Sequence, residues 1–541
     1  MGDRGGALAD ALSLIDQSIE RLTPERGIPG LALAITDRDG LLAHRNYGYA
    51  DLAALNPVDD ETLFQFGSIG KSFTAICLLQ LAEEGAIDLD APVTNYLPWF
   101  AVRSPYAPIT IHHLLTHTAG IIGGSDFPLD PRFEVWALRD TDAAPPGERC
   151  RYSNVGYKAL GLLLEAVTDK PYAEIIQERI YAPLGMTDSA SVITHDLRRR
   201  LAVGHVPFYD DRPWRPAHGL APATWLETNT ADGCLSATAT DLAIYLRMLL
   251  NEGASPSGRL LSPASFARMR APHTEISPGI PYGYGIIAME EDGRRLIEHG
   301  GDMVGYTSSM MGDVDANIGV TLLSNGMARL TSVADWTLRI IVAALAGEVL
   351  PELSAIESEI DAIEFAGIYR SATTDLSIEV EADQLILVSE RGRIPLEPMR
   401  SPAIPDAFIA SHPDLALFPL RFGRDGSGSV TELAHGGDWY ATDHYEGTRV
   451  FETPPEWAAY TGHYRAWNPW DSNFRIIIRK GALLQVSPSG QEETLHPDGA
   501  GFRVGDDPHS PERITFDTVV DGEALRARQA GGADYYRFFT P

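Results

Sequence analysis

Hydrophobic positions near the start of the chain first recur with helical spacing and then alternate with polar positions, as they do in strands. This pattern predicts a helix over residues 7–22 and strands over 31–36 and 41–49. Asp39-Gly40 lies between the two strands, and Asp-Gly between apolar runs is typical of a hairpin turn. The chain therefore opens with a helix and a β-hairpin.

The middle of the chain, residues 68–250, has mostly helical periodicity, with loops rich in proline and glycine. One helix is expected to begin near Ser68 and to end at Gly85, a residue type that favours helix C-termini. Later in the chain, the pattern predicts strands at 283–289, 294–299, 306–311 and 318–324 and a helix at 332–346. Strands at both ends with helices between them predict one antiparallel sheet beside a helical lobe, with a cleft for a site.

The pattern changes again after residue 347. Residues 348–364 are acidic and amphipathic, which predicts a linker helix. Short strands and turns follow, and Phe365–Arg370 matches Tyr460–Arg465. Three further pairs match in the same order: 385–388 with 483–486, 396–398 with 495–497, and 436–440 with 531–536. Two copies of about 90 residues, each built of alternating strands, predict two small antiparallel β-barrels.

The chain has 541 residues, which is long for one compact unit. We therefore expect an α+β domain, with an antiparallel sheet flanked by helices and a helical lobe, followed by two β-barrel domains. The expected boundaries are 1–347 for the α+β domain, 348–364 for the linker, 365–455 for the first barrel and 456–541 for the second.

The charge balance excludes some partners. The chain has 43 Lys and Arg against 74 Asp and Glu, a net charge of −31 at pH 7. Because a polyanion repels phosphate backbones and acidic membrane surfaces, we expect no nucleic-acid partner and no membrane partner. Without a signal-like N-terminus, a cytoplasmic location is expected, or a periplasmic or secreted one if a leader has been removed.

Ser68-Ile69-Gly70-Lys71 is the first motif that carries chemistry. Residues three apart on a helix share one face, so the Lys71 amine can lie within hydrogen-bond reach of Ser68 Oγ. A serine is a weak nucleophile unless a base lies beside it, and a lysine in this position can be that base.

Two further motifs follow. Tyr152-Ser153-Asn154 comes after Pro145-Pro146-Gly147, a turn-rich approach that would present the tyrosine on a loop. His299-Gly300-Gly301-Asp302 is expected to end a strand, and its glycines allow a ligand to approach the backbone closely.

Ser-x-x-Lys, Tyr-x-Asn and His-x-Gly in this order resemble the serine β-lactamase and penicillin-binding-protein superfamily, in its class C-like and peptidase S12 branch. Phe64–Gly67, Ile111–Gly120 and Asp232–Leu242 agree with it, and the resemblance covers roughly residues 8–347. It implies that residues 1–347 are a β-lactamase-like serine hydrolase domain.

The resemblance also implies roles for the motif residues. Ser68 would be the acylated nucleophile, and Lys71 would take or relay its proton. Tyr152 would act as the partner base and then as the acid for the leaving group. Backbone N–H groups of Ser68 and Asp302 would form the oxyanion hole.

Three residues would bind substrate: Asn154, His299 and Gly301. Asn154 would hold the substrate carbonyl or the Lys71 amine. Many β-lactamases and carboxypeptidases of the superfamily have lysine at the position of His299, and its charge binds the substrate carboxylate. Histidine, with a reference pKa near 6.5, is mostly neutral at pH 7. Weak recognition of β-lactams and of C-terminal D-alanine is therefore expected, and His-x-Gly resembles the D-aminopeptidases, amidases and esterases of the family.

The two barrels, expected to be lipocalin-like, also resemble the bacterial D-aminopeptidase architecture, in which a loop of the last barrel enters the active site. By position, residues 497–512, with Asp506 and Asp507, are the candidate loop. An acidic loop could bind a substrate ammonium group, and a solvated acidic turn is the alternative.

No metal and no cofactor are expected. His113 and His117 are spaced for one helix face, but no third ligand accompanies them, so a structural packing role is predicted. Cys77, Cys150 and Cys234 are too far apart in sequence for a disulfide framework or a CxxC-type metal site.

The sequence thus predicts a serine hydrolase that cleaves peptide or amide bonds of small or linear peptides, including D-residue or linearised cyclic-peptide substrates, through an acyl-serine. A carboxylesterase on the same site is the alternative. A β-lactamase or DD-carboxypeptidase ranks lower, and a non-catalytic ligand-binding protein ranks last. The expected partner is a small-molecule or peptide substrate, and the sequence leaves open whether the chain forms a homo-oligomer.

Overall fold

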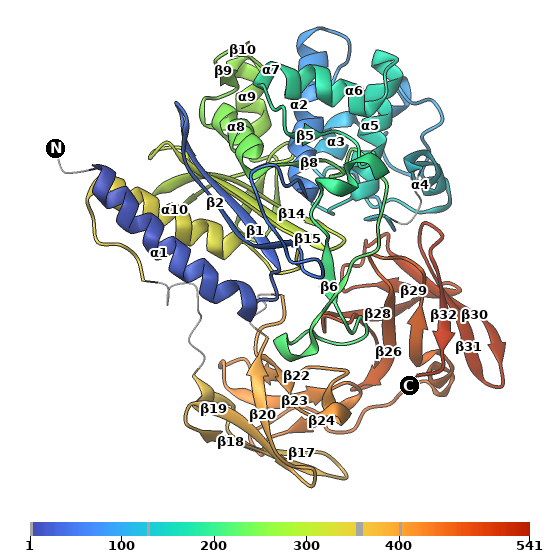
Figure 1. Cartoon of the computed structure of the whole chain (residues 1–541). Helices are drawn as coiled ribbons and strands as arrows, with labels where there is room; N and C mark the ends of the chain where they lie inside the picture. The colour runs from blue at the N-terminus through green and yellow to red at the C-terminus, as the bar shows by residue number, and fades with distance from the viewer. Residues whose placement is uncertain (1–3, 127–129, 353–360, 400–402, 541) are drawn as a thin grey trace. The chain divides into compact units, whose positions relative to one another are not determined.

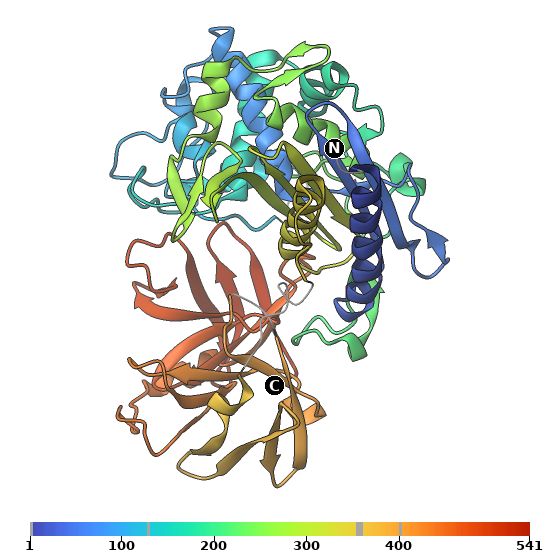
Figure 2. The same cartoon turned by 90° about the vertical axis from the view of Figure 1, so that its left-hand side faces the viewer.

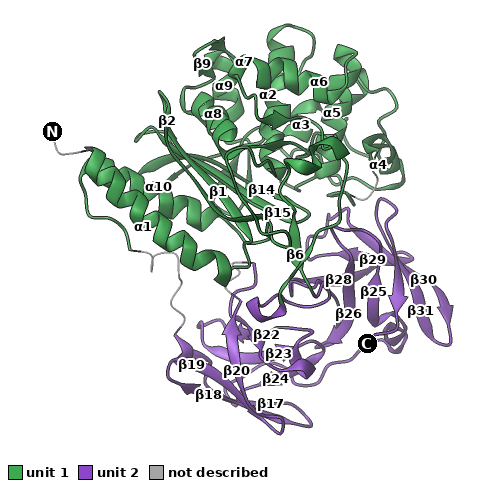
Figure 3. Cartoon of the chain, viewed as in Figure 1, with its two compact units in different colours: residues 1–208, 219–356 green, residues 209–218, 357–541 purple. Residues whose placement is uncertain are grey.

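The computed structural model describes residues 4–126, 130–352, 361–399 and 403–540. The chain divides into two compact units (Figure 3). Unit 1 contains residues 1–208 and 219–356, and unit 2 contains residues 209–218 and 357–541.

A nine-stranded antiparallel sheet forms the centre of unit 1 (Figure 1). Its strands, in spatial order, are β11 (Thr274–Ser277), β12 (Ile280–Tyr282), β13 (Ile287–Glu291), β14 (Arg294–Met303), β15 (Tyr306–Asp313), β16 (Ile318–Ser324), β1 (Gly30–Asp37), β2 (Leu41–Asp51) and β3 (Asn56–Pro57). β1 pairs with β16, and Leu33 lies opposite Leu322. The predicted antiparallel sheet, built from both ends of the domain sequence, is therefore confirmed.

Helices cover both faces of this sheet. α1 (Arg4–Glu25) and α10 (Thr331–Ala346) pack against each other on one face (Figures 1 and 2). Ile15 and Ile340 from these helices share a core with Leu33 of β1. α8 (Ala239–Leu250) packs against β16, where the Thr321 hydroxyl donates to Ala239 O over 3.0 Å. Because both faces are covered, every residue of β15 and β16 is buried.

A helical lobe lies beside the sheet. It contains α2 (Gly70–Glu83), α3 (Ile111–Leu115), α4 (Pro131–Ala137), α5 (Asn154–Thr168), α6 (Tyr172–Ile176), α7 (Ala182–Leu184) and α9 (Pro263–Arg270). Short strands join as β4 (Phe64–Gln65), β8 (Ser236–Ala237) and β5 (Ser189–Ala190), as β6 (His205–Pro207) with β7 (Leu220–Pro222), and as β9 (Ala254–Ser255) with β10 (Gly258–Arg259). No helix in the described part of the chain is long and apolar enough to cross a membrane.

Unit 2 contains two closed eight-stranded antiparallel barrels, as the internal repeat predicted. The first is formed by β17 (Gly367–Arg370), β18 (Asp375–Glu381), β19 (Gln384–Ser389), β20 (Gly392–Pro398), β21 (Ala407–Ala410), β22 (Leu420–Arg424), β23 (Val430–His435) and β24 (Asp438–Ala441). The second is formed by β25 (Gly462–Arg465), β26 (Asn473–Arg479), β27 (Ala482–Val486), β28 (Glu492–Asp498), β29 (Gly501–Val504), β30 (Arg513–Val520), β31 (Glu523–Gln529) and β32 (Asp534–Phe538).

Equivalent residues of the repeat make the same contacts in the two barrels. Tyr369 of β17 is buried, and its hydroxyl donates to Phe365 O over 2.9 Å. Tyr464 of β25 is also buried, and its hydroxyl donates to Tyr460 O over 2.9 Å. The repeated motif therefore places an equivalent buried tyrosine, with an equivalent hydrogen bond, on the first strand of each barrel.

The segment 209–218 leaves unit 1 between β6 and β7 and belongs to unit 2. Asp210 pairs with Arg465 and accepts from Ser472 Oγ over 2.9 Å, both in the second barrel. Arg215 Nη2 donates to Glu397 Oε1, in the first barrel, over 2.5 Å. Ion pairs thus fix this short segment to both barrels.

The predicted loop 497–512 lies in the second barrel. It contains the turn from β28 to β29, the strand β29 itself and the connection to β30. The Asp506 carboxylate accepts from His496 Nε2 over 2.9 Å, and this contact lowers the pKa of Asp506. Its entry into the active site stays a prediction.

The structure corrects several predicted boundaries. The strand expected at 283–289 begins only at Ile287, because Gly285 has φ +70° and a Cβ there would lie 2.6 Å from Ser72 N. The strand expected to end at His299 continues to Met303. The helix expected from Ser68 begins at Gly70, after a turn. In the predicted linker helix, residues 348–352 are not helical, and residues 353–360 lie outside the described residues.

Candidate active site

Ser68 and Lys71 meet at the start of α2. Ser68 lies in a 3₁₀ turn (Gly67–Ile69), and Lys71 lies in the first turn of the helix that follows. Lys71 Nζ donates to Ser68 Oγ over 2.9 Å and to Asp232 O over 2.6 Å. Lys71 is completely buried, whereas Ser68 is partly exposed. The predicted nucleophile thus has an amine within proton-transfer distance and an open side toward solvent.

Two glycines bring β14 against this turn. Gly67 has φ +54°, and a Cβ there would lie 2.6 Å from Asp302 N. A Cβ on Gly301 would lie 2.0 Å from Phe66 O. The backbones of Ser68 and Asp302 are therefore neighbours, as an oxyanion hole requires. The carbonyl of Phe66 thus occupies the Cβ side of Gly301, and the expected approach of a ligand to its backbone stays a prediction.

Tyr152 lies in the loop before α5, as predicted. Ser153 caps this helix, since its Oγ accepts from Gly156 N over 3.1 Å. Lys71 Nζ lies 4.8 Å from the centroid of the Tyr152 ring. The Tyr152 hydroxyl has no hydrogen-bond partner among the described residues, so the two side chains meet through the ring face.

His117 also belongs to this site, although the sequence predicted only a packing role for it. It has φ +57° and lies beyond the end of α3, so the expected shared helix face with His113 was wrong. Its ring centroid is 4.2 Å from that of Tyr152. Nδ1 accepts from Ser153 N over 3.0 Å, which leaves the proton of the neutral ring on Nε2. Burial, with Lys71 and His299 nearby, holds the pKa of His117 well below its ordinary value.

His299 lies on β14, three residues before Asp302. Its Nδ1 donates to Gly300 O over 2.5 Å, so Nε2 can accept from the Tyr282 hydroxyl, 3.2 Å away. Burial, with Lys71 nearby, lowers the pKa of His299 to about 4. The ring is therefore neutral at pH 7, in agreement with the expected absence of a cation for a substrate carboxylate at this position.

Asn154 is the first residue of α5, and its amide orientation is set by a neighbour. Asn154 Nδ2 donates to Asp126 Oδ2 over 2.7 Å. Its Oδ1 is buried and has no hydrogen-bond partner among the described residues. Asn154 Oδ1 is thus an unsatisfied acceptor, suited to the Lys71 amine, and Nδ2 has a second N–H, so the expected contact with a substrate carbonyl stays a prediction.

A buried charge cluster supports these residues and was missed in the sequence. The Lys158 cluster consists of Lys158, Asp126, Glu134 and Asp232. Lys158 Nζ lies 2.5 Å from Asp126 Oδ1, 2.6 Å from Glu134 Oε2 and 3.9 Å from Asp232 Oδ2. Burial disfavours its charged form, but the three carboxylates outweigh burial and raise the pKa of Lys158. A sequence signal exists, namely a lysine inside an apolar helical run, one turn after Asn154.

The other histidine and cysteine candidates have hydrogen bonds or burial that suit a structural role. His113 Nδ1 accepts from Thr110 N over 3.2 Å at the start of α3. Burial raises the pKa of the Cys77 thiol to about 12 and that of Cys234 to about 11. Within residues 4–126, 130–352, 361–399 and 403–540, no three His, Cys, Asp or Glu side chains group to hold a metal ion.

The fold and the Ser68–Lys71 pair define a protein of the serine hydrolase superfamily. The chain belongs to the β-lactamase family, because the family model described as Beta-lactamase matches residues 15–345.

Known proteins agree with this assignment. The chain is 32% identical over 380 residues to penicillin-binding protein 4 of Amycolatopsis lactamdurans, which covers 65% of this chain and 96% of that protein. It is 34% identical over 231 residues to esterase EstB of Burkholderia gladioli, which covers 38% of this chain and 57% of that protein. The octameric penicillin-binding protein homologue from Pyrococcus abyssi shares the fold with a TM-score of 0.59 and 23% identity, over 89% of this chain and 98% of that chain.

Proposed function

We propose that the protein hydrolyses amide or peptide bonds of small or linear peptides, including peptides with D-residues and linearised cyclic peptides, through an acyl-Ser68 intermediate. The observation that carries the proposal is the 2.9 Å hydrogen bond between Lys71 Nζ and Ser68 Oγ. The Asp232 carbonyl, 2.6 Å from the same amine, holds Lys71 in place.

In the proposed reaction, Ser68 Oγ attacks the substrate carbonyl carbon and its proton passes to the Lys71–Tyr152 pair. The backbone N–H groups of Ser68 and Asp302 stabilise the oxyanion. The pair then gives a proton to the leaving nitrogen, the C–N bond breaks and the amine departs. Water attacks the acyl ester, Ser68 Oγ regains a proton, and the carboxylic acid product leaves.

One feature favours a linear amide over a β-lactam as the substrate. Both substrates have an amine leaving group that needs a proton, which Lys71 with Tyr152 can supply, so the difference lies in the recognition of charge. His299 is neutral at pH 7, so it offers no cation to the carboxylate of a penicillin or of a C-terminal D-alanine.

A carboxylesterase is the second candidate. The 34% identity to an esterase over 231 residues favours it. An acyl-serine site accepts either leaving group, and an alkoxide or phenoxide needs less help from an acid than an amine does.

The test compares p-nitrophenyl acetate, D- and L-amino-acid p-nitroanilides and several linear peptides. Ser68→Ala is expected to lower kcat/KM by about 10³-fold or more on every cleaved substrate. Ser72→Ala is the matched control, because that hydroxyl lies one residue beyond Lys71 and bonds to Ile69 O instead. Full turnover by Ser68→Ala would refute the assignment of Ser68 as the nucleophile. Cleavage of the esters alone would refute the proposed peptidase activity and favour a carboxylesterase.

A further inference from the structure

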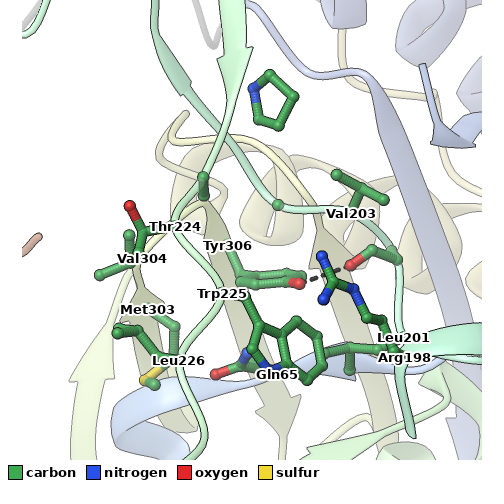
Figure 4. A pocket seen from close by; sticks show the side chains of 14 residues that line it. Gln65, Arg198, Leu201, Val203, Thr224, Trp225, Leu226, Met303, Val304 and Tyr306 are labelled. Atoms are coloured by element: carbon green, nitrogen blue, oxygen red, sulfur yellow. Dashed lines mark hydrogen bonds between the residues drawn. The ribbon is translucent and has the colours of Figure 1, made fainter. Parts of the chain in front are cut away.

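A pocket in unit 1 is lined in part by residues that lie close in sequence to the proposed oxyanion hole (Figure 4). One wall includes Gln65, two residues before Gly67, and another includes Met303, which directly follows Asp302. None of the side chains proposed to move protons lines it. A leaving group must lie against its proton donor, so a substrate group bound here, away from Lys71 and Tyr152, would belong to the acyl side of the scissile bond.

The pocket combines an apolar wall with unsatisfied polar atoms. Leu201, Leu226 and Val304 contribute apolar surface. Gln65 is 5% exposed, and its Oε1 has no hydrogen-bond partner in the described part of the chain. Trp225 Nε1 is likewise buried without a partner there. Buried polar groups are normally paired, so an acceptor and a donor remain here for a ligand.

Arg198 adds a cation to the same pocket. Its guanidinium carbon lies 5.1 Å from the centroid of a Trp225 ring, and Figure 4 shows both side chains converging with Tyr306. No carboxylate pairs with Arg198 among the residues that the structure describes. The nearby Glu227 pairs with His195 over 3.4 Å, and the Tyr306 hydroxyl is engaged by Ala202 O over 2.5 Å.

We propose that this pocket binds the acyl side of the substrate and that Arg198 selects acyl groups that end in a carboxylate. This rests on the proposed acyl-serine function and specifies its substrate class. The carboxylate accepts from the Arg198 guanidinium and from Trp225 Nε1, while Gln65 Oε1 accepts from an N–H of the acyl chain. A carboxylate bound in this way does not need a cation at His299, because it lies on the acyl side of the scissile bond and not on the leaving-group side.

The test uses p-nitrophenyl monoesters of glutaric, adipic and suberic acid. Each is compared with the p-nitrophenyl ester of the unbranched fatty acid of the same carbon number, after subtraction of the Ser68→Ala rate. The unsubstituted protein is expected to favour at least one diacid ester by about tenfold in kcat/KM. Arg198→Gln should abolish this preference by lowering kcat/KM for the diacid ester. Arg199→Gln, at a neighbouring exposed arginine that does not line the pocket, should retain it.

The outcomes separate the two proposals. If no diacid ester is preferred, or if Arg198→Gln keeps the preference, the carboxylate assignment is wrong, although Ser68-dependent ester cleavage persists. If no ester in the series is cleaved in a Ser68-dependent way, the proposed function itself fails. Trp225→Phe provides an independent check, since it keeps an aromatic ring, removes the Nε1 donor and should reduce the preference by a smaller factor.

Discussion

Replacing Lys158 by methionine removes the single cation of the Lys158 cluster and leaves an unbranched side chain that is one heavy atom shorter. The Lys158 side chain is 3% exposed, and its amine lies 2.5 Å from Asp126 and 2.6 Å from Glu134. The variant leaves these carboxylates buried without a counter-charge. Breaking a buried ion pair from one side typically costs about 3–5 kcal/mol, far more than the pair itself contributes.

The cost translates into a measurable shift of the unfolding midpoint of unit 1. A unit of about 350 residues has an unfolding entropy of roughly 0.7 kcal/mol/K. A loss of about 3–5 kcal/mol therefore lowers the midpoint by about 4–7 °C. The penalty should shrink in acid, because protonation neutralises the carboxylates that Lys158 no longer balances.

Differential scanning calorimetry at pH 7 and pH 4.5 measures this shift, with all variants scanned at the same rate. Lys170→Met is the matched control, because its amine lies 2.5 Å from Glu178 but the two side chains are 43% and 53% exposed. Exposed pairs contribute about 1 kcal/mol or less, so the control should shift by no more than about 1–2 °C. Equal shifts for Lys158→Met and Lys170→Met would refute the view that the cluster holds buried, mutually dependent charges.

Two other predictions concern the catalytic side of the molecule. Gly67→Ala should lower kcat by about 100-fold, because the new Cβ would lie 2.6 Å from Asp302 N and would displace that N–H from the proposed oxyanion hole. Gly40→Ala is the control and should leave kcat unchanged, because no atom lies within 4 Å of a Cβ there. Wild-type kcat for Gly67→Ala would contradict the proposed oxyanion hole. In the unfolded chain His299 binds a proton near pH 6.5, whereas in the folded state it does so only near pH 4. The stability that the neutral, buried His299 contributes is therefore present above pH 6.5 and is lost as the pH falls to 4. Calorimetry between these pH values should show that the loss of unfolding free energy is smaller by about 3 kcal/mol in His299→Gln than in the unsubstituted protein. The same loss in both proteins would count against a neutral, buried His299.

The sequence predicted best what is encoded by neighbours along the chain. The Asp39-Gly40 turn marked the β1–β2 hairpin, and the spacing of Ser68 and Lys71 predicted their contact. The repeat placed Tyr369 and Tyr464 at equivalent positions, where they make equivalent hydrogen bonds. Strand and helix patterns at the two ends of the domain also predicted the sheet correctly, because both faces of β1 and β16 must be buried.

Predictions failed where a contact joins distant segments. Asp126 holds Asn154 across 28 residues, and no local pattern distinguishes it from the other aspartates. At Gly301 the missing Cβ leaves room for the carbonyl of Phe66, a contact between distant segments that no local pattern predicts. His117 had helical spacing from His113, but a positive φ turns it toward Tyr152.

Sequence patterns were enough to predict the family, the order of the elements, the two barrels and the Ser68–Lys71 pair, because periodicity, repetition and short motifs are local properties of a chain. Four other features depended on the fold: the partner that orients the Asn154 amide, the place of His117 in the site, the association of residues 209–218 with the barrels, and the pocket that Arg198 shares with Trp225. Each of these depends on burial and on partners brought together from several segments, and the free energy of a buried polar atom is set by those partners rather than by its neighbours in sequence.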